Sequence, residues 1–148
     1  MHYDLNIERD ETESGEPSLL VTCPQFSEII TFGDSEIEAI GNSVKAIEEA
    51  IAGRMSRGEP IPPPIDEKRG KGPIAEVSAL TFLKSSLYMH CKERHVTRAE
   101  LARLLSWHRE QVDRLFRLDH NSRLDQMEAA YKAIGVALEF KIDFPAAA

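Results

Sequence analysis

The sequence predicts an α+β fold in two halves: a small antiparallel sheet packed on one helix, and an all-helical half that ends in a short strand. Apolar residues alternate near the N-terminus, which is the period of a strand, and recur every three or four residues from Ile37 onward, which is the period of a helix. A stretch crowded with proline and glycine separates the two patterns. We therefore predict one domain over residues 1–58, a linker over 59–76 and a second domain over 77–148.

The N-terminal half is predicted to contain three strands. In "YDLNIE" (residues 3–8) the apolar side chains of Tyr3, Leu5 and Ile7 share one face, as in a half-buried strand. The polar segment "DETESGEPS" then forms a hairpin loop, which is followed by the strand "SLLVTC" and by the strand "EIITF", ending at Gly33. Three short strands in succession predict an antiparallel meander.

One amphipathic helix completes this half. Ser35 and Glu38 form a capping box, which marks a helix N-terminus, and Gly58 supplies a stop. We expect the apolar stripe between them to face the sheet, which gives a β-β-β-α arrangement. Its members are Ile37, Ile40, Val44, Ile47, Ile51 and Met55.

The predicted linker is "GEPIPPPIDEKRGKGP". Its consecutive prolines favour an extended polyproline geometry, and its "EKRGKG" stretch is polar and expected to be flexible. A short extended piece, "IAEVSA", follows it.

Four helices are predicted in the C-terminal half: "ALTFLKSSLYMHCKER", "TRAELARLLS", "WHREQVDRLFRL" and "RLDQMEAAYKAIG". Thr97 and Glu100 form a capping box for the second, Ser122 is expected to cap the fourth, and Gly135 to stop it. The final "VALEFKI" (residues 136–142) alternates and is predicted to be an edge strand. The inward-facing residues are predicted to be Leu80, Leu83, Leu87, Leu101, Leu104, Leu105, Val112, Leu115 and Phe116.

The second and third of these helices are separated by about three residues, which is the arrangement of a helix-turn-helix core. In such a core the second helix enters the DNA major groove, so its inner face must be apolar and its outer face must carry hydrogen-bond donors. Six arginines and no lysine lie between Thr97 and Arg123, and arginine favours bidentate contacts with bases and phosphates. Taken singly, each arginine is equally explained as solvated surface, and Glu110 and Asp113 would either repel phosphates or orient the arginines. The predicted DNA-binding residues are Arg98, His108, Arg109, Gln111, Arg114, Arg117 and Arg123.

The net charge of −7 is divided unevenly along the chain. Residues 1–59 carry 13 acidic and 4 basic residues, a net −9, whereas residues 60–148 carry 12 acidic and 14 basic residues, a net +2. The acidic half favours a basic partner, and the mildly basic half can approach a polyanion.

Several classes of protein are disfavoured by the composition. No apolar run approaches the roughly 18 residues of a membrane span, and the N-terminus lacks the features of a secretion signal. The two distant cysteines are typical of reduced thiols, so we expect a cytoplasmic protein without membrane association. The five histidines form no HxxxH or HExxH pair, and we expect no metal and no cofactor.

Motifs in both halves carry a family resemblance. In the back half, "TRAELARLLSWHREQVDRLFRLDHNSRLDQMEAAYKAIGVALEF" is similar to the pattern "SRxELARxLGWxRxQVDRLxxLxHxSRLDxLExAxxALGxxLE", with Ser106 where a turn glycine is usual. In the front half, "HYDLNIERDE" and "LLVTCPQFSEIITFGDSEIEAIGNSVKAIEEAI" are similar to a pattern with a strand, a "P-x-x-P-G"-like turn and a "T-x-G-D-T-x-E-E-A" run into a helix. Phe26-Ser27 replaces the Pro-Gly pair of that pattern. On these motifs the chain resembles the HicB family of antitoxins, in the members that carry a helix-turn-helix.

This resemblance implies a fold and two partners. The front half would be a degraded RNase H-like domain that captures a HicA-type toxin, a small basic ribonuclease that cleaves mRNA. The back half would bind operator double-stranded DNA and repress the shared operon. We expect the acidic residues Asp10, Glu11, Glu28 and Asp34 to bind the toxin.

The residues bear on two other functions. A two-metal nuclease needs converging carboxylates, but Glu38 is better explained as a capping residue and Asp4 as a solvated strand face, so no enzyme activity is predicted. A stand-alone helix-turn-helix regulator, whose front half senses a ligand or oligomerises, is the alternative. Because one helix-turn-helix reads only a few base pairs, we expect a homodimer or homotetramer, with "VALEFKI" or "IAEVSA" at the seam.

Overall fold

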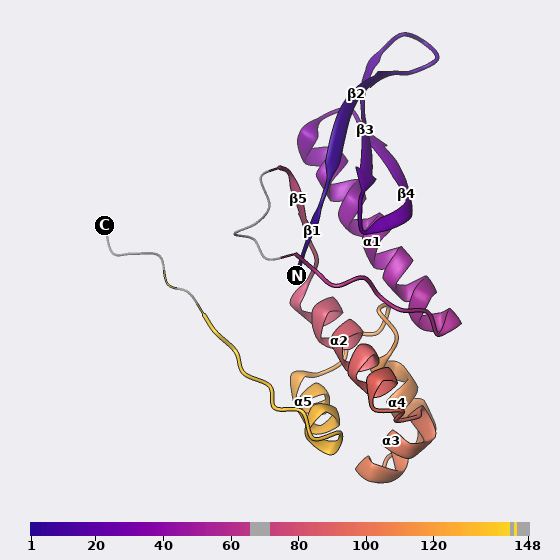
Figure 1. Cartoon of the computed structure of the whole chain (residues 1–148), viewed down its shortest axis with the longest axis vertical. Helices are drawn as coiled ribbons and strands as arrows, with labels where there is room; N and C mark the ends of the chain where they lie inside the picture. Colours follow the sequence, from indigo (N-terminus) through magenta and orange to yellow (C-terminus); the bar gives the residue numbers. More distant parts are fainter. Residues whose placement is uncertain (66–71, 143, 145–148) are drawn as a thin grey trace.

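The computed structural model describes residues 1–65, 72–142 and 144, and shows an elongated molecule with a sheet at one end and helices at the other (Figure 1). The predicted α+β class is confirmed: the N-terminal region is rich in strands and the described residues contain five helices. The two ends are in contact through the first two helices and through the segment that joins them.

The predicted first strand is divided in two at Leu5. β2 (Asn6–Glu11), β3 (Pro17–Cys23) and β4 (Phe26–Gly33) form the expected antiparallel meander, in the order β2-β3-β4. β1 (His2–Asp4) belongs to a separate pair with β5 (Ile74–Glu76). The prediction of one strand over residues 3–8 is therefore wrong. The buried Leu5 donates its N–H to the carbonyl of Pro73 (2.9 Å), and the chain passes there from one sheet to the other.

Much of the segment predicted as a linker is packed against the body. β5 takes its residues from "IAEVSA", Ile61 is buried, and the hydroxyl of Tyr3 donates to the carbonyl of Pro62 (3.0 Å). The flexible stretch predicted at "EKRGKG" lies outside the described residues, apart from Gly72. The β1–β5 pair therefore joins the start of the chain to the segment that enters the helical half.

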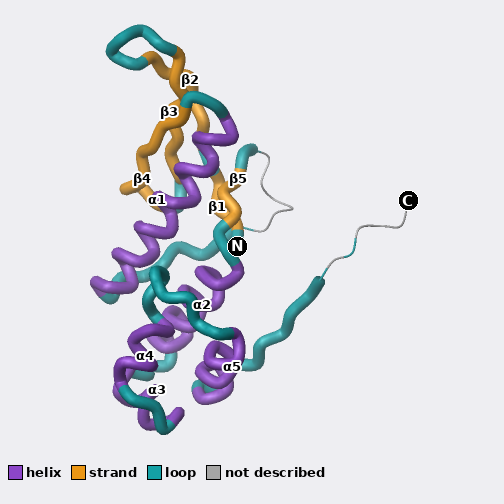
Figure 2. The backbone as a smooth tube through the Cα atoms, turned by 180° about the vertical axis from the view of Figure 1, so that it is seen from behind, coloured by secondary structure: helices purple, strands orange, loops and turns teal. Residues whose placement is uncertain are grey.

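The long helix α1 (Glu36–Arg57) covers one face of the three-stranded sheet (Figure 2). Ser35 is the N-cap and Gly58 the stop, as predicted, because Ser35 Oγ accepts from the N–H of Glu38 (3.2 Å) and Gly58 adopts a left-handed φ of 72°. The predicted capping box is not closed, since the Glu38 carboxylate accepts from the N–H of Asp34 (2.9 Å). Ile37, by contrast, is 87% exposed. It lies about 200° of helical rotation from Ala39, so in this first turn it points away from the sheet that Ala39 approaches at Gly33. The buried residues of this helix are Ala39, Ser43, Ile47, Ile51 and Met55.

Gly33 allows α1 to approach β4 closely. A Cβ at this position would lie 2.4 Å from the backbone nitrogen of Ala39, which cannot move without shifting the helix. We expect Gly33→Ala to lower the free energy of unfolding by about 1–3 kcal/mol, measured by urea denaturation. Gly41→Ala is the matched control. A Cβ there meets nothing within 4 Å, so this variant should gain about 0.5–1 kcal/mol through helix propensity. Equal stabilities of the two variants would contradict this packing.

Four helices make up the other half: α2 (Ala79–Glu93), α3 (Arg98–Leu105), α4 (Arg109–Leu115) and α5 (Leu124–Ala133). The predicted inward residues are buried or half-buried, except Leu104, which is 50% exposed. The predicted cap of α5 is also wrong. Arg123 occupies the N-cap, while Ser122 is buried and donates its hydroxyl to the carbonyl of Arg114 (3.3 Å). Gly135 ends α5 with a φ of 73°, as predicted.

The predicted C-terminal strand is absent. Residues 136–142 leave α5 as a chain without strand pairing to any described residue, and run away from the body (Figure 1). Phe140 and Ile142 are 60% and 75% exposed. Alternating hydrophobicity is not enough for a strand, because its N–H and C=O groups need a neighbouring strand, and the described part of this chain offers none here.

Candidate functional site

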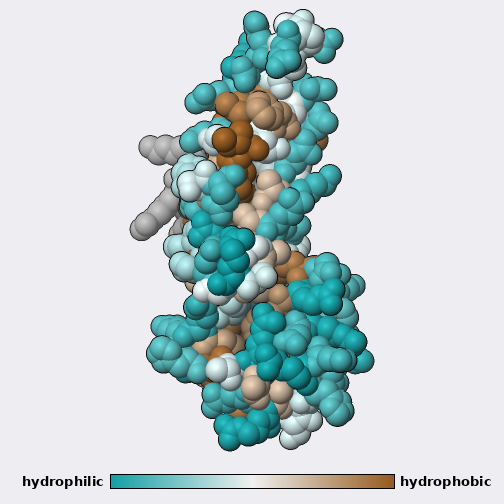
Figure 3. Space-filling view, turned by 90° about the vertical axis from the view of Figure 1, so that its right-hand side faces the viewer, coloured by the Kyte–Doolittle hydropathy of each residue, from teal (hydrophilic) through white to brown (hydrophobic). Residues whose placement is uncertain are grey.

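The sheet has a second apolar face, which the sequence reading missed. Cross-strand pairing places Glu8 opposite Leu20 and Leu20 opposite Phe32, while Thr22 lies opposite Ile30. Ile30 and Phe32 are 66% and 50% exposed, and Leu20 is half-buried. We call Leu20, Ile30, Phe32 and the adjoining Glu8 the outer sheet face. Figure 3 shows apolar side chains gathered on the surface of the sheet half.

A signal for this face was present in the sequence. Leu19 precedes Leu20 and Ile29 precedes Ile30, so these strands carry apolar residues at consecutive positions. Consecutive apolar residues point to both faces of a sheet, and only one face of this sheet is covered by α1.

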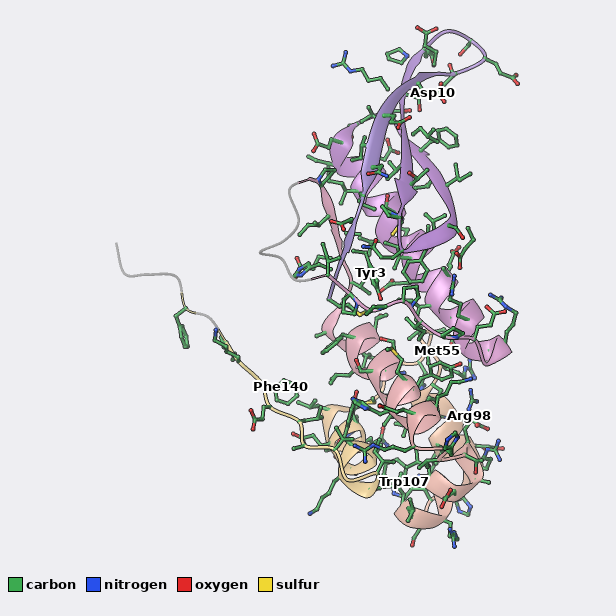
Figure 4. The ribbon with its side chains drawn as sticks, viewed as in Figure 1. Tyr3, Asp10, Met55, Arg98, Trp107 and Phe140 are labelled. Atoms are coloured by element: carbon green, nitrogen blue, oxygen red, sulfur yellow. The ribbon has the colours of Figure 1, made fainter. Side chains whose placement is uncertain are left out.

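The four acidic residues predicted for toxin capture do not form one cluster. Asp10 and Glu11 lie opposite Ser18 and Pro17 in the exposed hairpin (Figure 4), and Asp34 follows the end of β4 near the same end of the sheet. Glu28 lies near the other end of β4. Arg54 donates to both of its carboxylate oxygens (2.8 and 3.0 Å), which lowers the pKa of Glu28.

α3 and α4 are joined by Ser106, Trp107 and His108. Ser106 adopts a left-handed φ of 55°, which costs a non-glycine residue about 1–2 kcal/mol. Its N–H donates to the carbonyl of Arg103 (3.2 Å), and that of Trp107 donates to Ala102 (3.0 Å). Trp107 packs half-buried against the core, so the turn is held without the glycine that the sequence pattern expects.

α4 has one anchored face and one open face. Val112, Leu115 and Phe116 are buried, as the sequence predicts. Four of the predicted DNA-binding residues lie on the open face, spread from the N-cap to the last turn of this helix, where they are exposed and line a shallow surface depression with Glu110. They are His108, Arg109, Gln111 and Arg114.

Asp113 holds two of the predicted arginines. Its Oδ1 accepts from Arg98 Nη1 and from Arg109 Nε, both at 3.2 Å. The guanidinium of Arg98 also lies 5.0 Å from the centre of the Phe116 ring, so Arg98 braces α3 against α4 (Figure 4). The Oε1 of Gln111 accepts from the N–H of His108 (2.9 Å), which fixes the first turn of α4.

Arg117 and Arg123 lie apart from that group, in the segment between α4 and α5. Each forms a bidentate pair with a nearby carboxylate: Arg117 with Asp119 (3.0 and 2.6 Å) and Arg123 with Asp125 (3.1 and 2.8 Å). The first pairing lowers the pKa of Asp119. Exposed pairs of this kind contribute little stability, and the arginines can exchange them for phosphate.

Lys84 is a further feature that the sequence analysis did not predict. Its side chain is fully buried, and Nζ donates to the carbonyls of Arg114 (3.0 Å), Arg117 (2.5 Å) and His120 (2.5 Å). The signal was its position, since Lys84 falls on the apolar stripe of α2 between Leu83 and Leu87.

The comparisons with known proteins identify the family. No protein-family model matches the chain. Antitoxin HicB of Pseudomonas fluorescens (strain Pf0-1) is 30% identical over 118 residues, which cover 80% of this chain and 81% of that protein. The chain belongs to the HicB family of antitoxins. Antitoxin HicB 2 of Photorhabdus laumondii is 30% identical over 139 residues (94% of each chain), and Antitoxin HicB of Escherichia coli (strain K12) is 26% identical over 142 residues (93% and 96%).

Membership of the HicB family confirms the resemblance drawn from the sequence motifs and gives the chain an antitoxin role. None of its described helices combines the length and the apolar character needed to span a bilayer. Among the same residues, no three His, Cys, Asp or Glu side chains are grouped to hold a metal ion.

Proposed function

We propose that this HicB-family antitoxin neutralises a HicA-type toxin with its sheet half and represses its own operon with a helix-turn-helix formed by α3 and α4. The observation that carries the proposal is the separation of two unlike exposed surfaces at opposite ends of one elongated molecule. One is the outer sheet face in the acidic half, and the other is the arginine-bearing open face of α4.

DNA binding rests on the two faces of α4. Its buried residues fix the helix to the body, so its open side is free to enter a major groove about 12 Å wide. Arg109 and Arg114 can donate bidentately to guanine, and the amide nitrogen of Gln111 can reach adenine. Arg98 and Asp113 orient Arg109 through their shared bonds. Arg117, Arg123 and the first turn of α3 would contact phosphates.

Toxin capture rests on the outer sheet face. An apolar centre with charged surroundings is the composition of a protein interface, and the acidic half suits a basic toxin. Glu8, opposite Leu20 on the edge strand β2, sets a negative charge beside the apolar centre. A basic partner complements that charge, so we assign the face to the toxin. Asp10, Glu11 and Asp34 would steer the toxin from the hairpin end of the sheet.

Assembly rests on residues 136–142. Leu138, Phe140 and Ile142 alternate along this segment, and pairing with the same segment of a second copy would satisfy its backbone groups and cover its apolar side chains. A two-fold dimer would then present two copies of α4 to half-sites about 34–36 Å apart.

Deleting residues 136–148 is expected to convert the dimer into monomers and to remove cooperative operator binding. Without the paired segments, the seam loses both its backbone hydrogen bonds and its apolar contacts. Analytical ultracentrifugation of the deleted and full-length chains measures the change. If the shortened chain remains dimeric, the dimer interface lies in the sheet half and not at residues 136–142.

The proposal as a whole is tested with the full-length chain. Co-expression with a HicA toxin should restore growth and yield a stable complex, and the purified chain should shift a duplex carrying the promoter of its own gene. A chain that shifts the duplex but neither binds the toxin nor restores growth would instead be a stand-alone regulator. A chain that does neither would overturn the proposal.

A further inference from the structure

We propose that Lys84 is a positioning residue for DNA binding: its ammonium, which never reaches the DNA, fixes the C-terminal end of α4 and the turn that follows. This inference rests on the proposed DNA-binding function of α3 and α4. It assigns a role to a side chain that is remote from the open face of α4 and was not among the predicted site residues.

The geometry around Lys84 matches an ammonium group. A protonated lysine has three N–H donors, and three carbonyl oxygens, those of Arg114, Arg117 and His120, lie 2.5–3.0 Å from Nζ. The side chain is fully excluded from solvent. A buried cation is tolerated when its donors are all satisfied, and here the acceptors come from one short stretch of backbone.

That backbone coils around the ammonium in successive turns. The N–H of Arg117 donates to Arg114 (3.3 Å), that of His120 donates to Arg117 (3.3 Å), and that of Ser122 donates to His120 (3.0 Å). The three carbonyls that accept these bonds are the same three that converge on Lys84. Their oxygens carry partial negative charge, so the ammonium at the centre offsets their mutual repulsion and fixes where the three carbonyls point.

The turn bears directly on the proposed DNA contacts. Arg114 and Arg117 supply two of the three carbonyls, so a shift of this backbone displaces the side chains predicted to contact base and phosphate. Displacements of about 1 Å are enough to weaken bidentate contacts severely.

Lys84 lies on α2, and hydrogen bonds to neighbouring elements fix the position of this helix. The hydroxyl of Tyr131 on α5 donates to the carbonyl of Leu83 (2.7 Å), next to Lys84. On the other side, Thr81 donates to Glu48 of α1 (2.9 Å), and Tyr88 donates to the carbonyl of Glu59 (2.8 Å). α2 is thus hydrogen-bonded to α5 on one side and to α1 and the segment after it on the other. The ammonium of Lys84 holds the C-terminal end of α4 in a fixed position relative to α2.

The charge of the ammonium can be removed by pH as well as by mutation. Burial lowers the pKa of Lys84 to about 8, with Asp119 opposing this shift and Arg117 adding to it. The other side chains bonded in this region, Ser122 and Tyr131, are uncharged at neutral pH, since burial raises the pKa of Tyr131 to about 12. Lys84 is therefore protonated at neutral pH and loses one donor and its charge as the pH rises through about 8.

The sign of the accompanying stability change separates positioning from unfolding. Unfolded lysine has a pKa of about 10.4, so between about pH 8 and that value the unfolded chain binds more protons than the folded one. The contribution of Lys84 to the free energy of unfolding therefore rises over this interval. A fall in operator affinity in the same interval cannot come from loss of the fold through this group.

The test compares Lys84→Met with the wild-type chain on a fluorescent duplex carrying the promoter of its own gene, at several values from about pH 7 to about pH 9.5. At neutral pH the variant should bind at least about tenfold more weakly. Wild-type affinity should decline with a midpoint near pH 8, whereas the variant should show no such step, because arginine does not titrate in this range. Lys132→Met, which replaces an exposed lysine on α5, should keep the wild-type profile.

Two results would overturn the inference while leaving operator binding in place. One is wild-type affinity in a folded Lys84→Met variant, with folding checked by circular dichroism. The other is a flat pH profile of the wild-type chain, which decides the question even if the variant does not fold. If the wild-type chain fails to bind the duplex at any pH, the proposed DNA-binding function fails and this inference fails with it.

Discussion

Replacing Arg109 and Arg114 together by alanine is expected to abolish specific operator binding without disturbing the fold. Both side chains are exposed on the open face of α4, and the buried face is untouched. A bidentate arginine contact to a base contributes about 1–3 kcal/mol of discrimination, so losing two should weaken specific binding by roughly 30-fold to 10⁴-fold. The measurement is a titration of promoter duplex against unrelated duplex at physiological salt.

The matched control removes two exposed arginines from the sheet half, with Arg9→Ala and Arg57→Ala. This pair lowers the total positive charge equally but leaves α4 intact, so its operator affinity should stay close to wild type. Asp113 keeps its bond to Arg98 in the test variant, which preserves the brace between α3 and α4. Normal and specific binding by the Arg109/Arg114 variant would show that α4 does not enter the groove.

Replacing Ile30 and Phe32 by lysine is expected to abolish toxin neutralisation. The substitutions remove the two most exposed apolar side chains of the outer sheet face and place positive charge where a basic toxin would dock. Interface centres of this kind carry about 2–4 kcal/mol per residue, so affinity for the toxin should fall by at least about 10³-fold. The measurement is the dissociation constant of the purified antitoxin–toxin pair, by calorimetry.

Ile37→Lys provides the control for that variant. Ile37 is an exposed isoleucine in the same half, but it lies on α1 and outside the outer sheet face. It should bind the toxin as tightly as the wild-type chain does. Tight binding by the Ile30/Phe32 variant would move toxin capture to another surface, such as the hairpin that carries Asp10 and Glu11.

Point variants are better suited to these questions than removal of residues 1–58. That deletion would take away β1, the partner strand of β5, and would expose Ile61 and Val77, which are buried in the whole chain. Loss of function in the shortened chain would then report on a damaged helical half as much as on a missing toxin surface.

Features set by local chemistry could be predicted from the sequence. The caps at Ser35 and Thr97, the stops at Gly58 and Gly135, and the buried face of α4 depend on residues a few positions apart, so they are visible in the sequence. The family motifs extended this local reading to the antitoxin role.

Features set by distant contacts could not be predicted in the same way. The break at Leu5 depends on a bond to Pro73, and the phase of α1 depends on the close approach of Gly33 to Ala39. The alternation in residues 136–142 indicated a strand, but it did not show whether the same chain would supply a partner strand. Lys84 was missed because only the folded arrangement shows three carbonyls turned toward its ammonium.

The central claim is that one chain carries two separable surfaces, one for a toxin and one for DNA. The most direct test is growth of cells that express a HicA toxin together with each variant. We predict that the Arg109→Ala, Arg114→Ala chain restores growth as the wild-type chain does, and that the Ile30→Lys, Phe32→Lys chain does not. Growth restored by the second and not by the first would contradict the division between the sheet half and the helical half.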